Sequence, residues 1–137
     1  MPTLRKGSVK TIRKLGPDEL DMTVAAGFEF FKEGQIPGGF VPEIFLSNWK
    51  SLISNGKGVI LAMFEDEKYV GALGAILAPD LNNGHIVAIE CFWYVLPEHR
   101  GGGIQLLAEF ELWAKAAGAV RIAMTHLVKL QPEKLGK

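Results

Sequence analysis

Two features near the middle of the chain combine residue types and spacing that chemistry needs. Glu90 is the only acidic or basic side chain in the apolar run Ile86–Leu96. Shortly after this run, Arg100 is followed by Gly101, Gly102 and Gly103. A desolvated carboxylate has a raised pKa, which suits a general base, and glycines let a backbone approach a ligand closely. We therefore expect a base candidate and an anion site close together. The alternative for Glu90 is a carboxylate that faces a wet cleft or pairs with Lys or Arg.

The glycines stand between an apolar strand and an amphipathic helix. The pattern predicts a strand over Ile86–Leu96, a turn over Pro97–Gly103 and a helix from about Ile104 to Gly118. The N–H groups of a first helical turn have no partner within the helix and favour an anion such as a pyrophosphate. A P-loop is excluded because Ile104 and Gln105 stand where Lys and Ser or Thr are required. A Rossmann fingerprint is excluded because Leu106 replaces its third glycine and because no acidic residue ends the next strand.

The remaining elements must position this unit. We expect a fold of the mixed α/β class, with helices over about 19–32 and 42–54 and with Asp18 capping the first of them. The further strands are predicted at 8–14, 59–64, 69–77 and 120–125. The pair 59–64 and 69–77 reads as an antiparallel hairpin. Strands 86–96 and 120–125 should be parallel, because a helix connects them.

Composition limits the classes of function. The chain has 137 residues and no net charge, which fits one domain over 1–137 and gives no field that favours nucleic acid. Its one cysteine, Cys91, excludes an internal disulfide, offers no metal-ligand spacing and suggests a reducing, cytoplasmic setting. The first residues lack the apolar core of a signal peptide, and no apolar run is long enough to span a bilayer. We expect neither a membrane nor a nucleic acid partner, and no metal.

The turn and its flanks resemble motif A of the GNAT superfamily of acyl-CoA N-acyltransferases. That motif reads Arg/Gln-x-x-Gly-x-Gly/Ala after a hydrophobic strand and Val-x-Pro. Arg100 fills its first place, Gly103 its fourth and Gln105 its sixth, where the family has Gly or Ala. The order of elements over about residues 8–126 is also that of the family. The resemblance implies a twisted, mostly antiparallel mixed sheet flanked by helices.

The resemblance also implies an activity, namely transfer of an acetyl group from acetyl-CoA to a primary amine by direct attack. The backbones of Trp93 and Val95 would hold pantetheine, and the residues of the turn would hold the pyrophosphate: Arg100, Gly101, Gly102, Gly103, Ile104 and Gln105. Glu90 is the candidate general base and His126 a lesser candidate for acid or base. The acceptor would be a small-molecule amine or a protein amine. The alternative function is a non-catalytic acyl-CoA-binding or protein-interaction domain of the same fold.

The carboxyl-terminal part departs from the family pattern. The family usually continues with a helix that carries a tyrosine acid and with two more strands, and the sequence ends at Lys137 before any such tyrosine. We therefore expect a domain that lacks these elements. Three explanations stay open: a fragment, a partner chain that completes the sheet, or a missing acid. An exposed last strand would favour association, for example as a homodimer.

Overall fold

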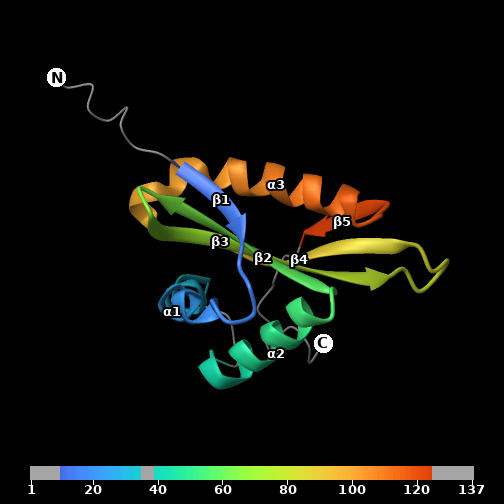
Figure 1. Ribbon diagram of the computed structural model, residues 1–137, viewed down its shortest axis with the longest axis horizontal. Coiled ribbons are helices and arrows are strands. Elements are labelled where there is room, and N and C mark those ends of the chain that lie inside the picture. The colour runs from blue at the N-terminus through green and yellow to red at the C-terminus, as the bar shows by residue number, and fades with distance from the viewer. Residues whose placement is uncertain (1–9, 35–38, 125–137) are drawn as a thin grey trace, which may run out of the picture.

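A single mixed sheet is the centre of the molecule. The computed structural model describes residues 10–34 and 39–124. Its five strands lie in the order β1-β2-β3-β4-β5 (Figure 1). They are β1 (Lys10–Lys14), β2 (Gly58–Glu65), β3 (Lys68–Pro79), β4 (Ile86–Val95) and β5 (Arg121–Met124). Neighbouring strands are antiparallel except β4 and β5, which are parallel as the connecting helix predicts. The predicted fold class is confirmed.

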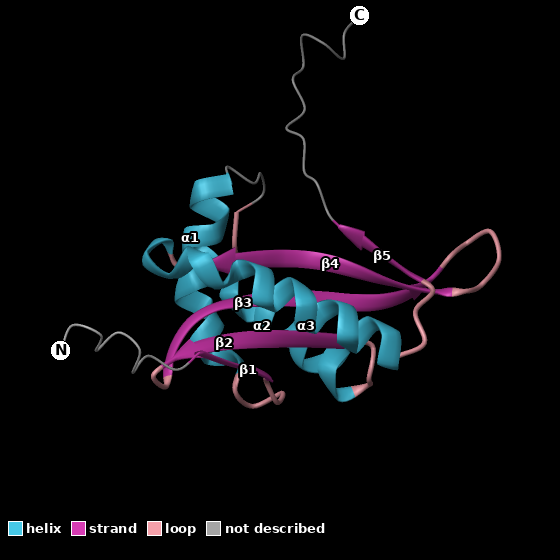
Figure 2. Ribbon diagram, turned by 90° about the horizontal axis from the view of Figure 1, so that it is seen from above, coloured by secondary structure: helices cyan, strands magenta, loops and turns pink. Residues whose placement is uncertain are grey.

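Helices cover both faces of the sheet. Figures 1 and 2 show α3 (Gly103–Ala116) along one face, with α1 (Val24–Gly34) and α2 (Pro42–Ser54) on the other. Two short 3-10 helices complete the described chain, η2 (Leu20–Thr23) before α1 and η3 (Pro97–Gly102) before α3. Helix α2 has the predicted bounds, whereas the first predicted helix is divided into η2 and α1. None of the helices in residues 10–34 and 39–124 is long and apolar enough to cross a membrane.

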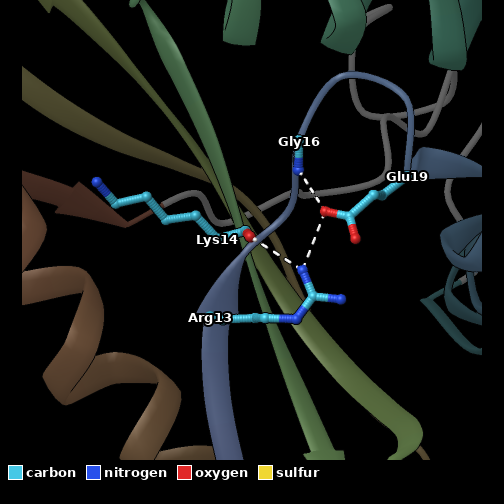
Figure 3. Close-up of polar contacts among 4 residues, drawn as sticks. All are labelled: Arg13, Lys14, Gly16 and Glu19. Atoms are coloured by element: carbon cyan, nitrogen blue, oxygen red, sulfur yellow. Dashed lines mark hydrogen bonds and ion pairs between the residues drawn. The ribbon is translucent and has the colours of Figure 1, made fainter.

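The turn after β1 corrects the predicted role of Asp18. The residue before η2 is Glu19, and η2 has no side-chain cap. Instead, the Glu19 carboxylate accepts hydrogen bonds from the Gly16 N–H at 2.8 Å and from Arg13 Nη1 at 3.0 Å (Figure 3). A carboxylate that joins the end of a strand to the next turn stabilises the loop directly. The Glu19 carboxylate thus holds the turn between β1 and η2, and the predicted helix cap by Asp18 is wrong.

Each sheet face has its own hydrophobic core. The core under α3 contains Leu106, Phe110 and Ala114 of that helix, packed on inward residues of β2, β3 and β4. The core under α1 and α2 contains Leu20 and Trp49, with Phe45 and Leu52 packed against it. Phe28 of α1 and Ile44 of α2 remain exposed, at 50% and 58% accessibility.

Candidate active site

Strand β4 contains a β-bulge at Cys91, directly after Glu90. Ala75 of β3 pairs with Glu90, and its neighbour Gly74 pairs with Phe92, so that Cys91 is an extra residue on β4. Cys91 and Phe92 both pack toward the core under α1 and α2. A β-bulge of this kind bends the strand and shifts the phase of its side chains. From Phe92 onward, the two faces of β4 are therefore exchanged relative to a regular strand.

Gly74 explains how the bulge is accommodated. A Cβ atom placed on Gly74 would overlap the Phe92 ring, whereas the glycine leaves room for that ring over the neighbouring strand. Gly71, three positions earlier on β3, is also closely packed, since its Cβ would lie 2.8 Å from the Tyr94 carbonyl oxygen. Such close packing is typical of glycine within a strand.

Strands β4 and β5 pair over only part of β4. Their register runs from Val87 opposite Arg121 to Glu90 opposite Met124, the last described residue of β5. The described pairs of β4 with β5 therefore end at Glu90. The N–H and C=O groups along a strand edge can bond an extended ligand. Trp93 and Val95, whose backbones the resemblance assigns to pantetheine, lie in the part of β4 that follows Glu90.

The glycine turn is more ordered than the sequence predicts. It forms η3, which runs directly into α3, and Gly102 occupies the N-cap position without a side-chain cap. The three glycines have different surroundings. Gly101 has open space around its missing Cβ, a Cβ on Gly102 would lie 2.9 Å from the Met63 side chain, and one on Gly103 would lie 3.7 Å from the Trp93 ring. Gly102 thus packs against the end of the Met63 side chain, while Gly101 leaves the backbone accessible for a ligand.

A hydrogen bond joins this turn to the sheet. His99 Nδ1 lies 2.8 Å from Glu65 Oε1 at the end of β2, and both side chains are about one-fifth exposed. The carboxylate can only accept, so the imidazole Nδ1–H is the donor. A cation is also close to the turn, since Lys10 Nζ of β1 lies 3.5 Å from the position of a Gly102 Cβ. The hydrogen bond holds the turn in place, and the lysine adds positive charge to the region that is predicted to bind an anion.

Glu90 lies at the point where the described pairing of β4 and β5 ends. Its side chain is buried, with 6% exposure. Because it pairs with Ala75, it shares a sheet face with Ala75 and Ala88, which belong to the core under α3. Burial, and then the charge of Glu90, raises the pKa of the neighbouring Cys91 thiol to about 11. A thiol held neutral in this way is a poor nucleophile.

An apolar pocket of about 30 Å³ lies on the opposite face of the sheet from Glu90. Seven of its eleven lining residues are aromatic, which makes its lining almost entirely hydrocarbon. These aromatic residues come from α1, from Phe40 just before α2, and from α2, β3 and β4. The pocket was not predicted from the sequence. The signal was present, because five of the eight phenylalanines fall within residues 28–45, and distant Phe92 joins them only in the fold.

The remaining predicted site residues are exposed or only partly described. Ile104 and Gln105 lie in the first turn of α3 and are exposed. The structure describes the backbone of Arg100 within η3, whereas its side chain and all of His126 lie outside the described residues. In residues 10–34 and 39–124, no group of three or more His, Cys, Asp or Glu side chains is arranged to hold a metal ion.

The family model of the acetyltransferase (GNAT) family matches residues 26–132. The chain belongs to the GNAT family. This match includes the glycine turn and the strands that form the site, so the resemblance drawn from Arg100 and Gly103 is confirmed. A search among curated proteins found no match.

Solved GNAT structures share the fold at low sequence identity. A predicted acetyltransferase from Clostridium acetobutylicum, solved with acetyl-CoA, is 17% identical with a TM-score of 0.75, over 94% of this chain and 90% of that chain. Glucosamine-6-phosphate N-acetyltransferase from Arabidopsis thaliana is 20% identical with a TM-score of 0.66, over 94% and 91%. An aminoglycoside acetyltransferase from an uncultured soil metagenomic sample is 20% identical with a TM-score of 0.68, over 94% and 88%.

Proposed function

We propose that this GNAT protein is an N-acetyltransferase that moves an acetyl group from acetyl-CoA to a primary amine. The observation that carries the proposal is the proximity of two features, the part of β4 beyond its last described pair with β5 and the glycine turn that opens α3. The Trp93 ring, which lies against Gly103, joins them. An extended thioester arm bound to the strand edge and a diphosphate bound at the helix start would then belong to one ligand.

The residues of the turn fit such a ligand. Gly101 leaves an open approach to the backbone, no side chain caps the start of α3, and Lys10 adds a positive charge nearby. Backbone N–H groups at a helix start favour a diphosphate because they carry a partial positive charge. When bound, acetyl-CoA would supply the activated acetyl group. The backbones of Trp93 and Val95 would orient it, with the residues from Arg100 to Gln105 at its diphosphate.

The acceptor amine would attack the acetyl carbonyl carbon directly. A carbon–nitrogen bond forms, the carbon–sulfur bond breaks, and the sulfur leaves as a thiolate that takes up a proton to give free CoA. The amine nitrogen loses one proton in the process, and we propose Glu90 as its destination. Because Glu90 faces α3 while the aromatic pocket lies on the other face, this transfer would run through a water molecule at the end of the β4–β5 pairing.

The experiment is a measurement of thiol release from acetyl-CoA in the presence of a panel of primary amines, with mass spectrometry of the products. We expect amine-dependent release of CoA and a product heavier by one acetyl group. A non-catalytic acyl-CoA-binding domain, the alternative reading, would bind CoA in a calorimetric titration but release no thiol. A chain that neither binds CoA nor releases thiol would exclude both readings. The single thiol Cys91 suggests in addition that the protein works in a reducing compartment such as the cytoplasm.

A further inference from the structure

Lys10, the first described residue of β1, brings its charged end to the glycine turn. Its Nζ lies 3.5 Å from the position that a Cβ would take on Gly102, the N-cap residue of α3 (Figure 1). Two covalent bonds separate a Cβ from the backbone nitrogen of the same residue, so the ammonium is within about 6 Å of the Gly102 nitrogen. A residue far upstream in the sequence therefore lies beside the start of α3.

The alternation of side chains along β1 explains why Lys10 reaches this place. Side chains two residues apart share a face of a strand. Ile12 packs against the core under α3, so Lys10 and Lys14 lie on that same face. In the register with β2, Lys10 is opposite Glu65 and Lys14 is opposite Leu61. At a rise of about 3.3 Å per residue, the two lysines are about 13 Å apart, which sets Lys14 away from the turn.

The start of α3 is prepared for an anion. The first turn of this helix contains no acidic residue, and no side chain caps Gly102. Gly101 is exposed and has open space around its missing Cβ. The carboxylate opposite Lys10, that of Glu65, accepts the hydrogen bond from His99. The partial positive charge of a helix start and the ammonium of Lys10 therefore act on the same small region.

A lysine on an outer strand often has a simpler role, because charged side chains keep the edge of a sheet solvated. That role accounts for Lys14, which is exposed. It does not account for the position of the Lys10 ammonium. A cation beside the start of a helix is repelled by the partial positive charge there, since helix starts favour anions and helix ends favour cations. An anion bound between the two makes the arrangement favourable.

We propose that Lys10 binds the diphosphate of CoA together with the backbone of the glycine turn, as a cofactor-binding residue outside motif A. This inference rests on the proposed transfer from acetyl-CoA. A phosphate oxygen that accepts a backbone N–H of the turn at about 2.9 Å is within reach of the ammonium, because the lysine stem is exposed and flexible. The contact adds affinity for the donor and takes no part in the transfer of the acetyl group.

Three variants test the charge of Lys10. Lys10→Met keeps most of the stem and removes the charge, Lys10→Arg keeps a positive charge, and Lys14→Met is the matched control on the same strand face. Calorimetric titration with CoA gives Kd, and thermal unfolding without ligand gives stability. We expect Lys10→Met to raise the Kd of CoA about fivefold to tenfold. Lys10→Arg and Lys14→Met should stay within about threefold of the parent chain.

A second ligand identifies the group of CoA that Lys10 contacts. Dephospho-CoA lacks the 3′-phosphate and keeps the diphosphate, so Lys10→Met should weaken the binding of both ligands by the same factor. A loss confined to CoA would place Lys10 at the 3′-phosphate and overturn the assignment to the diphosphate. The loss should also shrink at about 0.5 M NaCl, because salt screens an exposed charge. A loss that does not change with salt would contradict a direct ionic contact.

The same titrations separate this inference from the proposed function. If Lys10→Met binds CoA as tightly as Lys14→Met does, Lys10 is not a ligand of CoA, while acetyl transfer stands. A lower melting temperature with unchanged affinity would then make Lys10 a cross-strand partner of Glu65 only. If the parent chain binds neither CoA nor dephospho-CoA, the proposed function fails, and the role of Lys10 with it.

Discussion

His99 Nδ1 donates a hydrogen bond of 2.8 Å to Glu65 Oε1, and this contact joins the glycine turn to the far end of β2. The two residues are far apart in sequence, and neither belongs to the motif that identifies the turn. Because η3 continues directly into α3, fixing His99 also fixes the start of that helix. The contact therefore positions the backbone that is proposed to bind the diphosphate, without touching the ligand.

Breaking this contact should weaken the binding of acetyl-CoA more than it slows the chemical step. We expect His99→Phe to raise the KM for acetyl-CoA about threefold to tenfold, with kcat changed less than twofold, and to lower the free energy of unfolding by about 1 kcal/mol. Glu65→Gln should behave similarly. In the double variant, the two losses should not add, because they remove one shared interaction. Fully additive losses would show that the pair is not coupled.

Glu90→Gln tests the proposed base. The amide keeps the volume of the buried side chain but does not accept the proton of the amine, so we expect kcat to fall at least tenfold. The affinity for CoA, measured by calorimetry, should be unchanged. Glu109→Gln, an exposed position on α3, is the control for the loss of one negative charge. Turnover equal to that of the control would remove Glu90 from the mechanism and leave it a structural carboxylate.

Gly101→Ala and Gly102→Ala should separate ligand approach from packing. A methyl group fits the open space at Gly101, so this variant should keep its melting temperature while losing about tenfold in affinity for CoA. At Gly102 the same methyl group meets Met63 at 2.9 Å, and we expect a lower melting temperature. The measurements are thermal unfolding without ligand and CoA titration. Unchanged CoA affinity in Gly101→Ala would mean that the ligand does not approach this backbone.

Cys91 should react slowly with alkylating reagents in the folded protein. Its pKa of about 11, raised first by burial and then by the charge of Glu90, leaves very little thiolate at pH 8. We expect iodoacetamide to alkylate Cys91 of the folded chain at least tenfold more slowly than Cys91 of the denatured chain. Mass spectrometry measures the extent of alkylation. Cys91→Ser should keep turnover within about twofold. A burst of alkylation that abolishes activity at pH 8 would instead indicate a reactive nucleophile.

The same pKa shift predicts how stability depends on pH. The folded chain holds the thiol proton more tightly than the unfolded chain, whose cysteine has an ordinary pKa near 8.5. The stabilisation is therefore complete below that pH and is lost as the pH rises toward 11. Chemical denaturation gives the free energy of unfolding, which should fall more between pH 8 and pH 10.5 for the parent chain than for Cys91→Ala. An equal fall in both chains would contradict the pKa shift.

The sequence by itself determined the elements that local patterns control. The strand over Ile86–Val95, the glycine turn and the parallel crossover to β5 follow from apolar runs, from glycine and from the connection rule, and all are present in the fold. The family followed from Arg100, Gly103 and the Val-x-Pro lead-in, because a motif is contiguous in the chain. These features depend on residues that are neighbours in sequence, and so they can be read from it.

Only the tertiary structure decided what residues far apart in sequence do together. The bulge at Cys91 depends on the space over Gly74, the anchoring of His99 depends on Glu65, and Phe92 completes a ring begun by Phe30 and Phe45. Side-chain packing across the sheet sets each of these outcomes. Packing is a property of pairs that the linear order does not specify.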